Sequence, residues 1–215
     1  MNYLKHVASA ATIAAAGLAL AACGGPSSTA PTTASNPPSS PSVEAITPSP
    51  TTTTPTTPAV VRSARGNIVK KLRQASGVSD EENNRLVNFT VNSITVDAPC
   101  TGPYPQALEN GHLVVLDVTI ETTPELAKEG DGYDKFDMNG AMFKFVGANG
   151  TTFNGNLGTN GAFSCLPDEQ MVPTTGVGPA EKVKAKIALD LPQTKGTLVF
   201  KSYLTTGNAG WEWTF

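Results

Sequence analysis

The sequence predicts an all-β fold, an antiparallel β-sandwich. Short segments in which apolar and polar residues alternate recur from about residue 85 to the C-terminus, and Gly- and Asn-rich turns separate them. Almost no segment has helical periodicity. A chain of 215 residues has room for one such domain plus appendages.

The strand patterns are most regular in the second half of the chain. We predict strands over residues 113–121, 182–191, 197–203 and 211–215. In 182–191, apolar residues alternate with Lys182, Lys184, Lys186 and Asp190, which is typical of a strand with one wet face. Because the link from 182–191 to 197–203 is too short for a parallel crossover, we expect these two strands to form a hairpin.

Three other segments complete the predicted sheets. Residues 67–75 are expected to form the first strand, at a sheet edge and with the lysines turned outward. Residues 85–96 alternate until Asn92-Ser93, where the phase slips, and this slip predicts a β-bulge or a strand that bends between sheets. Residues 142–153 predict a hairpin around an Asn-Gly turn.

The only helix signal is "TPELAKE" at residues 123–129, where Thr123 is a candidate cap and Pro124 takes the first helical position. It is long enough for one or two turns. About seven short strands with this little helix indicate a β-sandwich of the immunoglobulin type over residues 62–215.

The N-terminus has the layout of a secretory signal peptide over residues 1–22. Lys5 supplies a positive charge, and the uncharged run from Val7 to Ala22 is shorter than the ~20 residues that span a bilayer. The run ends in "LAAC", which resembles the lipobox of bacterial lipoproteins. The resemblance implies that Cys23 is lipidated and becomes the N-terminus after cleavage. The alternative is an ordinary signal peptide with a chance cysteine.

Residues 23–61 predict a disordered stalk. Pro, Ser and Thr dominate this segment, no aromatic residue occurs in it, and Glu44 is its only charge. Such a composition cannot bury enough apolar surface to offset the entropy of ordering. A flexible chain of this length spans roughly 30 Å root-mean-square, so it can hold a domain away from a membrane. The composition is also similar to that of glycosylated stalks.

Several strand motifs, together with the lipobox and the stalk, resemble one family. They are "FTVNSITVD", "GHLVVLDVTIE", "FKFVGANGTTF", "AEKVKAKIALDLP" and "GWEWTF". They are similar to the actinobacterial immunoglobulin-like lipoprotein domain of unknown function, often labelled after telomeric repeat-binding factor 2. The layout also resembles the secreted immunoprotective antigen family of mycobacteria. The resemblance covers about residues 66–215. It implies an immunoglobulin-like fold and an extracytoplasmic location, but no substrate and no catalytic residues.

Cys100 and Cys165 are the two cysteines left once Cys23 carries lipid. Export would place them in an oxidising compartment, where paired cysteines usually bridge. Neither has a basic neighbour close in sequence that would make it reactive. We therefore predict a structural disulfide that ties the long loop of residues 154–179 to the end of an early strand. The alternative is two unrelated thiols, one of them free.

Composition and motifs argue against several functions. A net charge of -3 gives no basic footprint for nucleic acid. His112 is the one histidine after residue 23, so we expect a surface turn residue and not a metal ligand or catalytic base. Asp131, Asp134 and Asp137 have the wrong spacing for an EF-hand loop, although loop carboxylates can still bind calcium. We expect no enzyme activity and no cofactor.

Three surface features are candidates for ligand binding. The first is a basic stripe made of Lys182, Lys184 and Lys186, which is otherwise a solubilising strand face. The second is the pair Trp211 and Trp213, for which core packing is favoured over an exposed aromatic platform. The third is the loop 154–179, because long loops in compact domains are often functional.

These observations favour a lipid-anchored, non-catalytic module of the cell envelope that faces the cell wall. It would bind an envelope protein, a wall polymer or a small ligand. The alternative is a carrier or sensor of a small apolar ligand held between the sheets. A third hypothesis is a hydrolase that uses Asp131, Asp134 or Asp137, which would need two converging carboxylates.

Replacing Cys23 with alanine tests the lipobox. We expect Cys23→Ala to release the protein from membranes or to leave the precursor uncleaved. The reason is that acyl chains, at about 0.8 kcal/mol per buried CH₂, would supply nearly all of the attachment. Membrane fractionation and intact-mass measurement check this. A variant that stays in the membrane pellet at its mature mass contradicts the lipobox interpretation.

Overall fold

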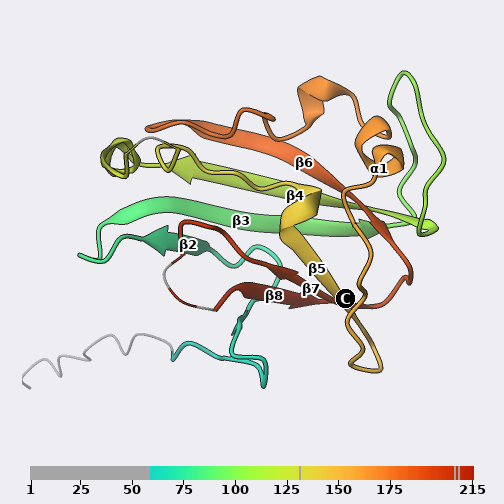
Figure 1. The fold of residues 1–215 in the computed structure, drawn as a ribbon, viewed down its shortest axis with the longest axis horizontal. Helices are drawn as coiled ribbons and strands as arrows, with labels where there is room; N and C mark the ends of the chain where they lie inside the picture. The colour runs from blue at the N-terminus through green and yellow to red at the C-terminus, as the bar shows by residue number, and fades with distance from the viewer. Residues whose placement is uncertain (1–58, 131, 206, 208) are drawn as a thin grey trace, which may run out of the picture. The chain divides into compact units, whose positions relative to one another are not determined.

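The computed structural model describes residues 59–215 except Asp131, Thr206 and Asn208. The predicted signal peptide, Cys23 and nearly all of the predicted stalk therefore lie outside the described residues. In the described part of the chain, eight strands form two four-stranded sheets, with little helix (Figure 1).

Every strand pair in the two sheets is antiparallel except β1 with β8. The first sheet contains, in spatial order, β1 (Ile68–Val69), β8 (Trp211–Thr214), β7 (Gly196–Phe200) and β5 (Phe143–Gly147). The second contains β2 (Ser76–Ser79), β3 (Arg85–Val96), β4 (His112–Thr122) and β6 (Lys182–Leu191). Short helices occupy the connections: η1 (Pro124–Lys128), η2 (Gly140–Met142), α1 (Asn160–Ser164) and η3 (Asp168–Gln170).

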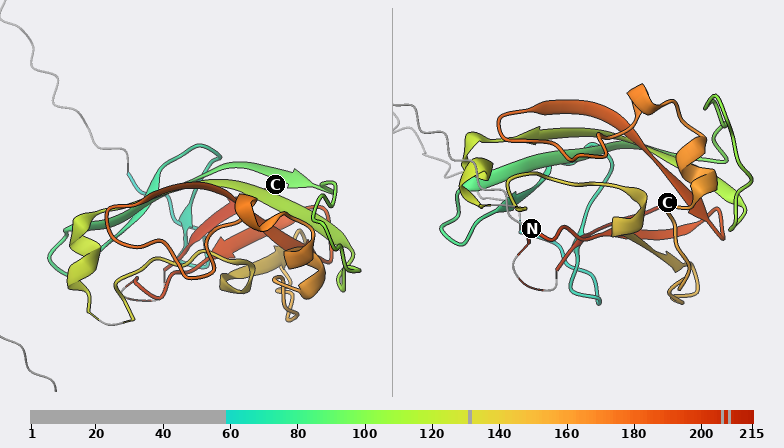
Figure 2. Two further views of the ribbon diagram at one scale, coloured as in Figure 1. Left: turned by 90° about the horizontal axis from the view of Figure 1, so that it is seen from above. Right: turned by 45° about the horizontal axis from the view of Figure 1, so that its top comes forward.

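The core lies between the two sheets, because each sheet turns one apolar face toward the other. Phe89 of β3 contacts Phe200 of β7 and Trp211 of β8 edge-on, with ring centroids 5.5 and 4.9 Å apart. All three side chains are buried. Fully burying one large apolar side chain contributes about 1.5–3 kcal/mol. Two sheets that share one core form the arrangement of a β-sandwich, seen from two further directions in Figure 2.

Two local predictions agree with the structure. The register between β3 and β4 shifts between Val91 and Ser93, so the predicted bulge lies at Asn92. The predicted helix begins at Pro124, although it is a 3-10 helix. Its N-cap Thr123 makes no side-chain cap bond, since the Thr123 hydroxyl donates to the carbonyl of Arg85 at 2.6 Å.

The predicted hairpin of 182–191 with 197–203 is wrong. The strand β6 pairs with β4 along its whole length in the second sheet, whereas β7 lies between β8 and β5 in the first sheet. Pro192 follows β6 directly and cannot donate to a ladder, so the chain leaves one sheet there and enters the other.

The predicted first strand and the predicted 142–153 hairpin are each only partly formed. Residues 67–75 divide between β1 and a turn at Arg73, whose φ of 64° breaks the extended backbone before β2 begins in the other sheet. After β5, the chain returns only as an isolated bridge of Thr152 with Val146. The partner of β5 is instead β7, because that pairing places both strands over the core.

Truncating Phe89 tests the shared core. We expect Phe89→Ala to lower the free energy of unfolding by about 3–5 kcal/mol, because the cavity would lie between both sheets. Tyr104→Ala is the control, since this tyrosine is 83% exposed. Urea denaturation of both variants measures the difference, and equal losses would contradict a core centred on Phe89.

Candidate functional site

The outer face of the second sheet is exposed to solvent at one end, and at the other end α1 and its flanking loop cover it. At the wet end, Lys182 forms an ion pair with Glu121 at 2.9 Å. At the covered end, α1 and its flanking loop bury a second apolar cluster against β4 and β6. Its members are Leu113, Val115, Ala162, Cys165, Leu166 and Ala188. The basic stripe of the sequence therefore covers only half of β6.

Asp190 of β6 holds α1 and its flanking loop against the second sheet through hydrogen bonds. Its side chain is fully buried, which corrects the prediction that it lies on the wet face. The carboxylate accepts hydrogen bonds from the backbone N–H groups of Glu109 at 2.6 Å, Asn110 at 3.1 Å and Gly111 at 3.0 Å. It also accepts from the hydroxyl of Thr159 at 2.9 Å. A buried charge is tolerated in a protein when it is hydrogen-bonded in this way.

Thr159 extends this connection to α1. Its hydroxyl oxygen accepts from the N–H of Ala162 and so caps the helix, while its hydroxyl hydrogen is given to Asp190. The carboxylate thus joins three segments that are far apart in sequence: β6, the 109–111 turn and the start of α1.

A disulfide provides the second attachment of the loop. Cys100, just after β3, is bonded to Cys165, just after α1, with Cα atoms 4.4 Å apart and a sequence separation of 65. The structure thus agrees with the predicted pairing. The N–H groups of Thr101 and Gly102 also donate to the carbonyl of Cys165, at 2.8 and 3.0 Å. In the chain-entropy model, closing a loop of this length contributes roughly 4 kcal/mol.

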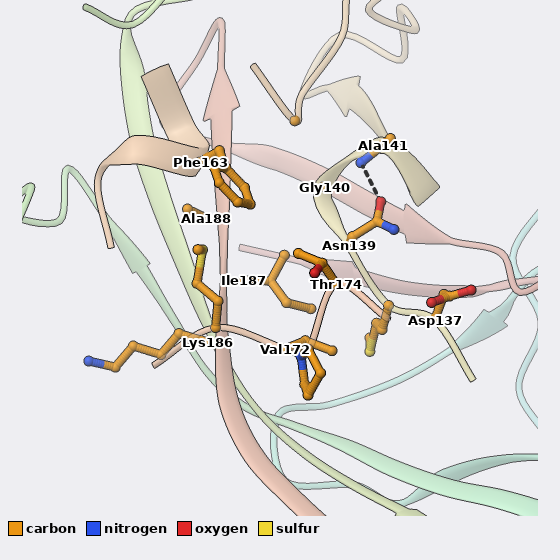
Figure 3. Close-up of a pocket in the computed structure, with 14 residues that line it drawn as sticks. Asp137, Asn139, Gly140, Ala141, Phe163, Val172, Thr174, Lys186, Ile187 and Ala188 are labelled. Atoms are coloured by element: carbon orange, nitrogen blue, oxygen red, sulfur yellow. Dashed lines mark hydrogen bonds between the residues drawn. The ribbon is translucent and has the colours of Figure 1, made fainter. Parts of the chain in front are cut away.

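A cavity of about 240 Å³ lies at the outer edge of β6, beside this anchored loop (Figure 3). Its walls come from β6, from the segment leading into η2 and from the long loop. Apolar side chains dominate them, notably Phe163, Met171, Val172 and Ile187. Figure 3 shows Val172, Thr174 and Ile187 among the residues that line the cavity, while the Lys186 side chain extends away. Its ammonium group donates to Gln170 at 2.7 Å.

The loop is hydrogen-bonded to the edge of β6 on both sides of the cavity. The N–H of Asp190 donates to the carbonyl of Leu157 at 2.8 Å, and the N–H of Val172 donates to the carbonyl of Lys186 at 3.3 Å. Between these bonds, Gly140 and Gly158 touch. A Cβ built on Gly140 would lie 2.8 Å from the Cα of Gly158, so only glycine permits this approach.

The sequence-predicted ligand residues do not gather at this cavity. Trp211 and Trp213 are 4% and 2% exposed, so the aromatic-platform hypothesis is wrong, because both rings are needed to fill the core. Of the basic stripe, Lys186 lines the cavity, whereas Lys182 and Lys184 do not. Residues of the loop 154–179 form part of the cavity wall.

His112 and Asp134 do not line the cavity, whereas Asp137 does. His112 starts β4, partly exposed, and its Nδ1 lies 2.7 Å from a carboxylate oxygen of Asp97. Asp131 lies outside the described residues. Among the residues that are described, no group of three His, Cys, Asp or Glu side chains is placed to hold a metal ion.

Asp137 links the acidic segment to the cavity, which it lines. The hydroxyl of Tyr203 donates to the Asp137 carboxylate at 3.1 Å and to the carbonyl of Lys135 at 2.7 Å. Burial raises the pKa of Tyr203, and the negative charge of Asp137 raises it further, so this phenol stays protonated and holds the carboxylate in place.

Phe163, Met171 and Val172 are cavity residues that sequence patterns did not indicate. Phe163 lies in the short helix α1, and Met171 and Val172 lie in the irregular chain after η3. This segment has no periodicity in the sequence, and only its length singled it out. In Ala59–Phe215, apart from the three omitted positions, we find no helix that is long and apolar enough to cross a membrane.

Fold and site together define a β-sandwich with a loop-walled, mostly apolar cavity at the edge of one sheet. Comparisons of the chain with family models, curated protein sequences and solved structures give no match.

Neutralising Asp190 tests its role in fastening the loop. We expect Asp190→Asn to lower the free energy of unfolding by about 2–4 kcal/mol, because the amide would turn a donor toward N–H groups that need an acceptor. Asp117→Asn, on the exposed part of the same face, should change it by less than about 0.5 kcal/mol. Denaturant unfolding measures both, and equal effects would contradict the assigned role.

Proposed function

We propose that this protein is a lipid-anchored cell-envelope lipoprotein whose immunoglobulin-like domain is a non-catalytic binding or adaptor module. The cavity at the edge of β6 is its ligand site. The observation that carries the proposal is the cavity itself, walled by a loop that Asp190 and the Cys100–Cys165 disulfide hold in place. A wall held in this way is formed before the ligand arrives, which lowers the entropic cost of binding.

The chemistry of the walls supports a small apolar group as the ligand. Pockets for drug-sized molecules usually measure about 300–1,000 Å³, and this one is smaller, about 240 Å³. It fits one large apolar side chain of a protein partner, or a short acyl or aromatic group. Asp137, Asn139 and Thr174 lie among the lining residues and offer hydrogen-bonding groups that would orient the bound group.

The second candidate function, a carrier or sensor of a small apolar ligand, places the ligand in this cavity and not between the sheets. The apolar lining of the cavity favours it, but the cavity lies beside β6 and not between the two sheets, where aromatic side chains fill the core. A carried ligand would therefore be small and would enter from the sheet edge. The lipobox and the Ser/Thr/Pro segment support placement of the domain on the outer side of the membrane.

Blocking the cavity with a larger side chain tests whether the cavity binds a ligand. The full chain, purified from membranes, is used to capture ligands from envelope extracts, with Ala141→Phe as the blocked variant. Ala141 lines the cavity and is exposed, so a phenylalanine there would enter the space without disturbing the core. Ala127→Phe, an exposed alanine on η1, is the control.

We expect a component, identified by mass spectrometry, that binds the wild type and Ala127→Phe and is lost, by roughly tenfold or more, with Ala141→Phe. Retention of every captured component by Ala141→Phe would exclude the cavity as the ligand site.

A further inference from the structure

A second concave surface lies at the opposite edge of the sandwich. The strands β1 and β2 are the edge strands on one side of the sandwich, and β5 and β6 are the edge strands on the other side. A groove of about 890 Å³ runs between β1 and β2 and includes residues 59–61, where the described chain begins. We call it the basic groove and define it by its exposed and charged members: Val60, Val61, Val69, Lys70, Lys71, Leu72, Arg73 and Arg85.

Several apolar side chains of the basic groove are exposed to solvent. Val60 is 63% exposed, Val61 64% and Leu72 45%. They are among the few large apolar side chains that are exposed in the described residues. Apolar side chains gathered on one face mark an interaction site.

The same groove carries a concentrated positive charge. Residues 59–79 contain five Lys or Arg and no Asp or Glu, although acidic residues outnumber basic ones in the whole chain, 18 to 15. Arg65 is paired with the buried carboxylate of Glu212, whereas Lys71, Arg73 and Arg85 form no ion pair with a described residue. Lys70 and Arg85 both line the groove. Partial burial lowers the pKa of Lys70, and the nearby positive charge of Arg85 lowers it further.

We propose that the basic groove docks on the surface of an anionic phospholipid bilayer, as a second attachment beside the lipid anchor. Lipid explains both features: basic side chains approach anionic headgroups, and the valines and Leu72 enter the boundary between headgroups and acyl chains. An acidic wall polymer would use the charges but would leave the apolar side chains in water.

The course of the chain supports this occupant. Residues 23–58 connect the proposed anchor at Cys23 to Ala59, which lies on the groove itself, so this is the first face of the domain that the anchored chain reaches. This step rests on the proposed function, whereas the composition of the groove does not. Since β5 and β6 lie at the other edge, docking through the basic groove turns the cavity away from the membrane.

Vesicle binding tests the proposal independently of lipidation. The full chain carrying Cys23→Ser is mixed with phosphatidylcholine vesicles that contain or lack phosphatidylglycerol, and the readout is the ratio of the two partition coefficients. Residues 1–22 are common to all variants, so comparison between variants removes their contribution. The test pair is Lys71→Gln/Arg73→Gln, both exposed, and the matched control is Lys182→Gln/Lys184→Gln, exposed lysines of the outer stripe.

We expect the phosphatidylglycerol preference to fall roughly fivefold for each groove charge removed, and to change little in the control. Val60→Ser/Leu72→Ser should weaken binding to both kinds of vesicle. Thermal unfolding of each variant confirms that the fold is kept. The proposal is overturned if the wild-type groove shows no preference for anionic vesicles, or if the control pair loses as much as the test pair.

Discussion

The buried carboxylate of Asp190 is the constraint on which the layer of loops over the second sheet depends. Taken out of water, it must be surrounded by donors, and those donors come from the 109–111 turn and from Thr159 at the start of α1. Once these are bonded, the loop that follows β5 lies over the outer face of β4 and β6 and closes a second apolar cluster there. The disulfide belongs to this layer, and so does one wall of the cavity.

The sandwich thereby acquires two edges with different chemistry. At the β5–β6 edge, the long loop encloses a small apolar cavity in a rigid wall of paired backbone and touching glycines. At the β1–β2 edge, short strands leave a groove that is open, apolar and cationic. The strand order separates the cavity from the groove by the width of the sheets.

Most strands were predictable from alternation, because a half-buried strand imposes a period of two on its residues. The bulge at Asn92 followed from the same rule, since an extra residue shifts the phase. Pairing was not predictable in this way: β6 and β7 are neighbours in sequence but belong to different sheets. Alternation is a property of one strand, whereas partner choice depends on which face each strand buries, so the hairpin prediction failed.

The sequence by itself predicted the all-β class and the bond between Cys100 and Cys165, because these follow from alternation and from counting cysteines. The length of segment 154–179 also singled it out, and this segment forms part of the cavity wall. Only the tertiary structure decided that Asp190 is buried, that Trp211 and Trp213 are core residues, and that Phe163 and Met171 wall a cavity. The physical reason is that burial of one side chain depends on what covers it. Trp211 and Trp213 are covered by the opposite sheet. Asp190 is covered by a loop without periodicity, which is held by the Cys100–Cys165 disulfide and by the hydrogen bond from Thr159 to Asp190.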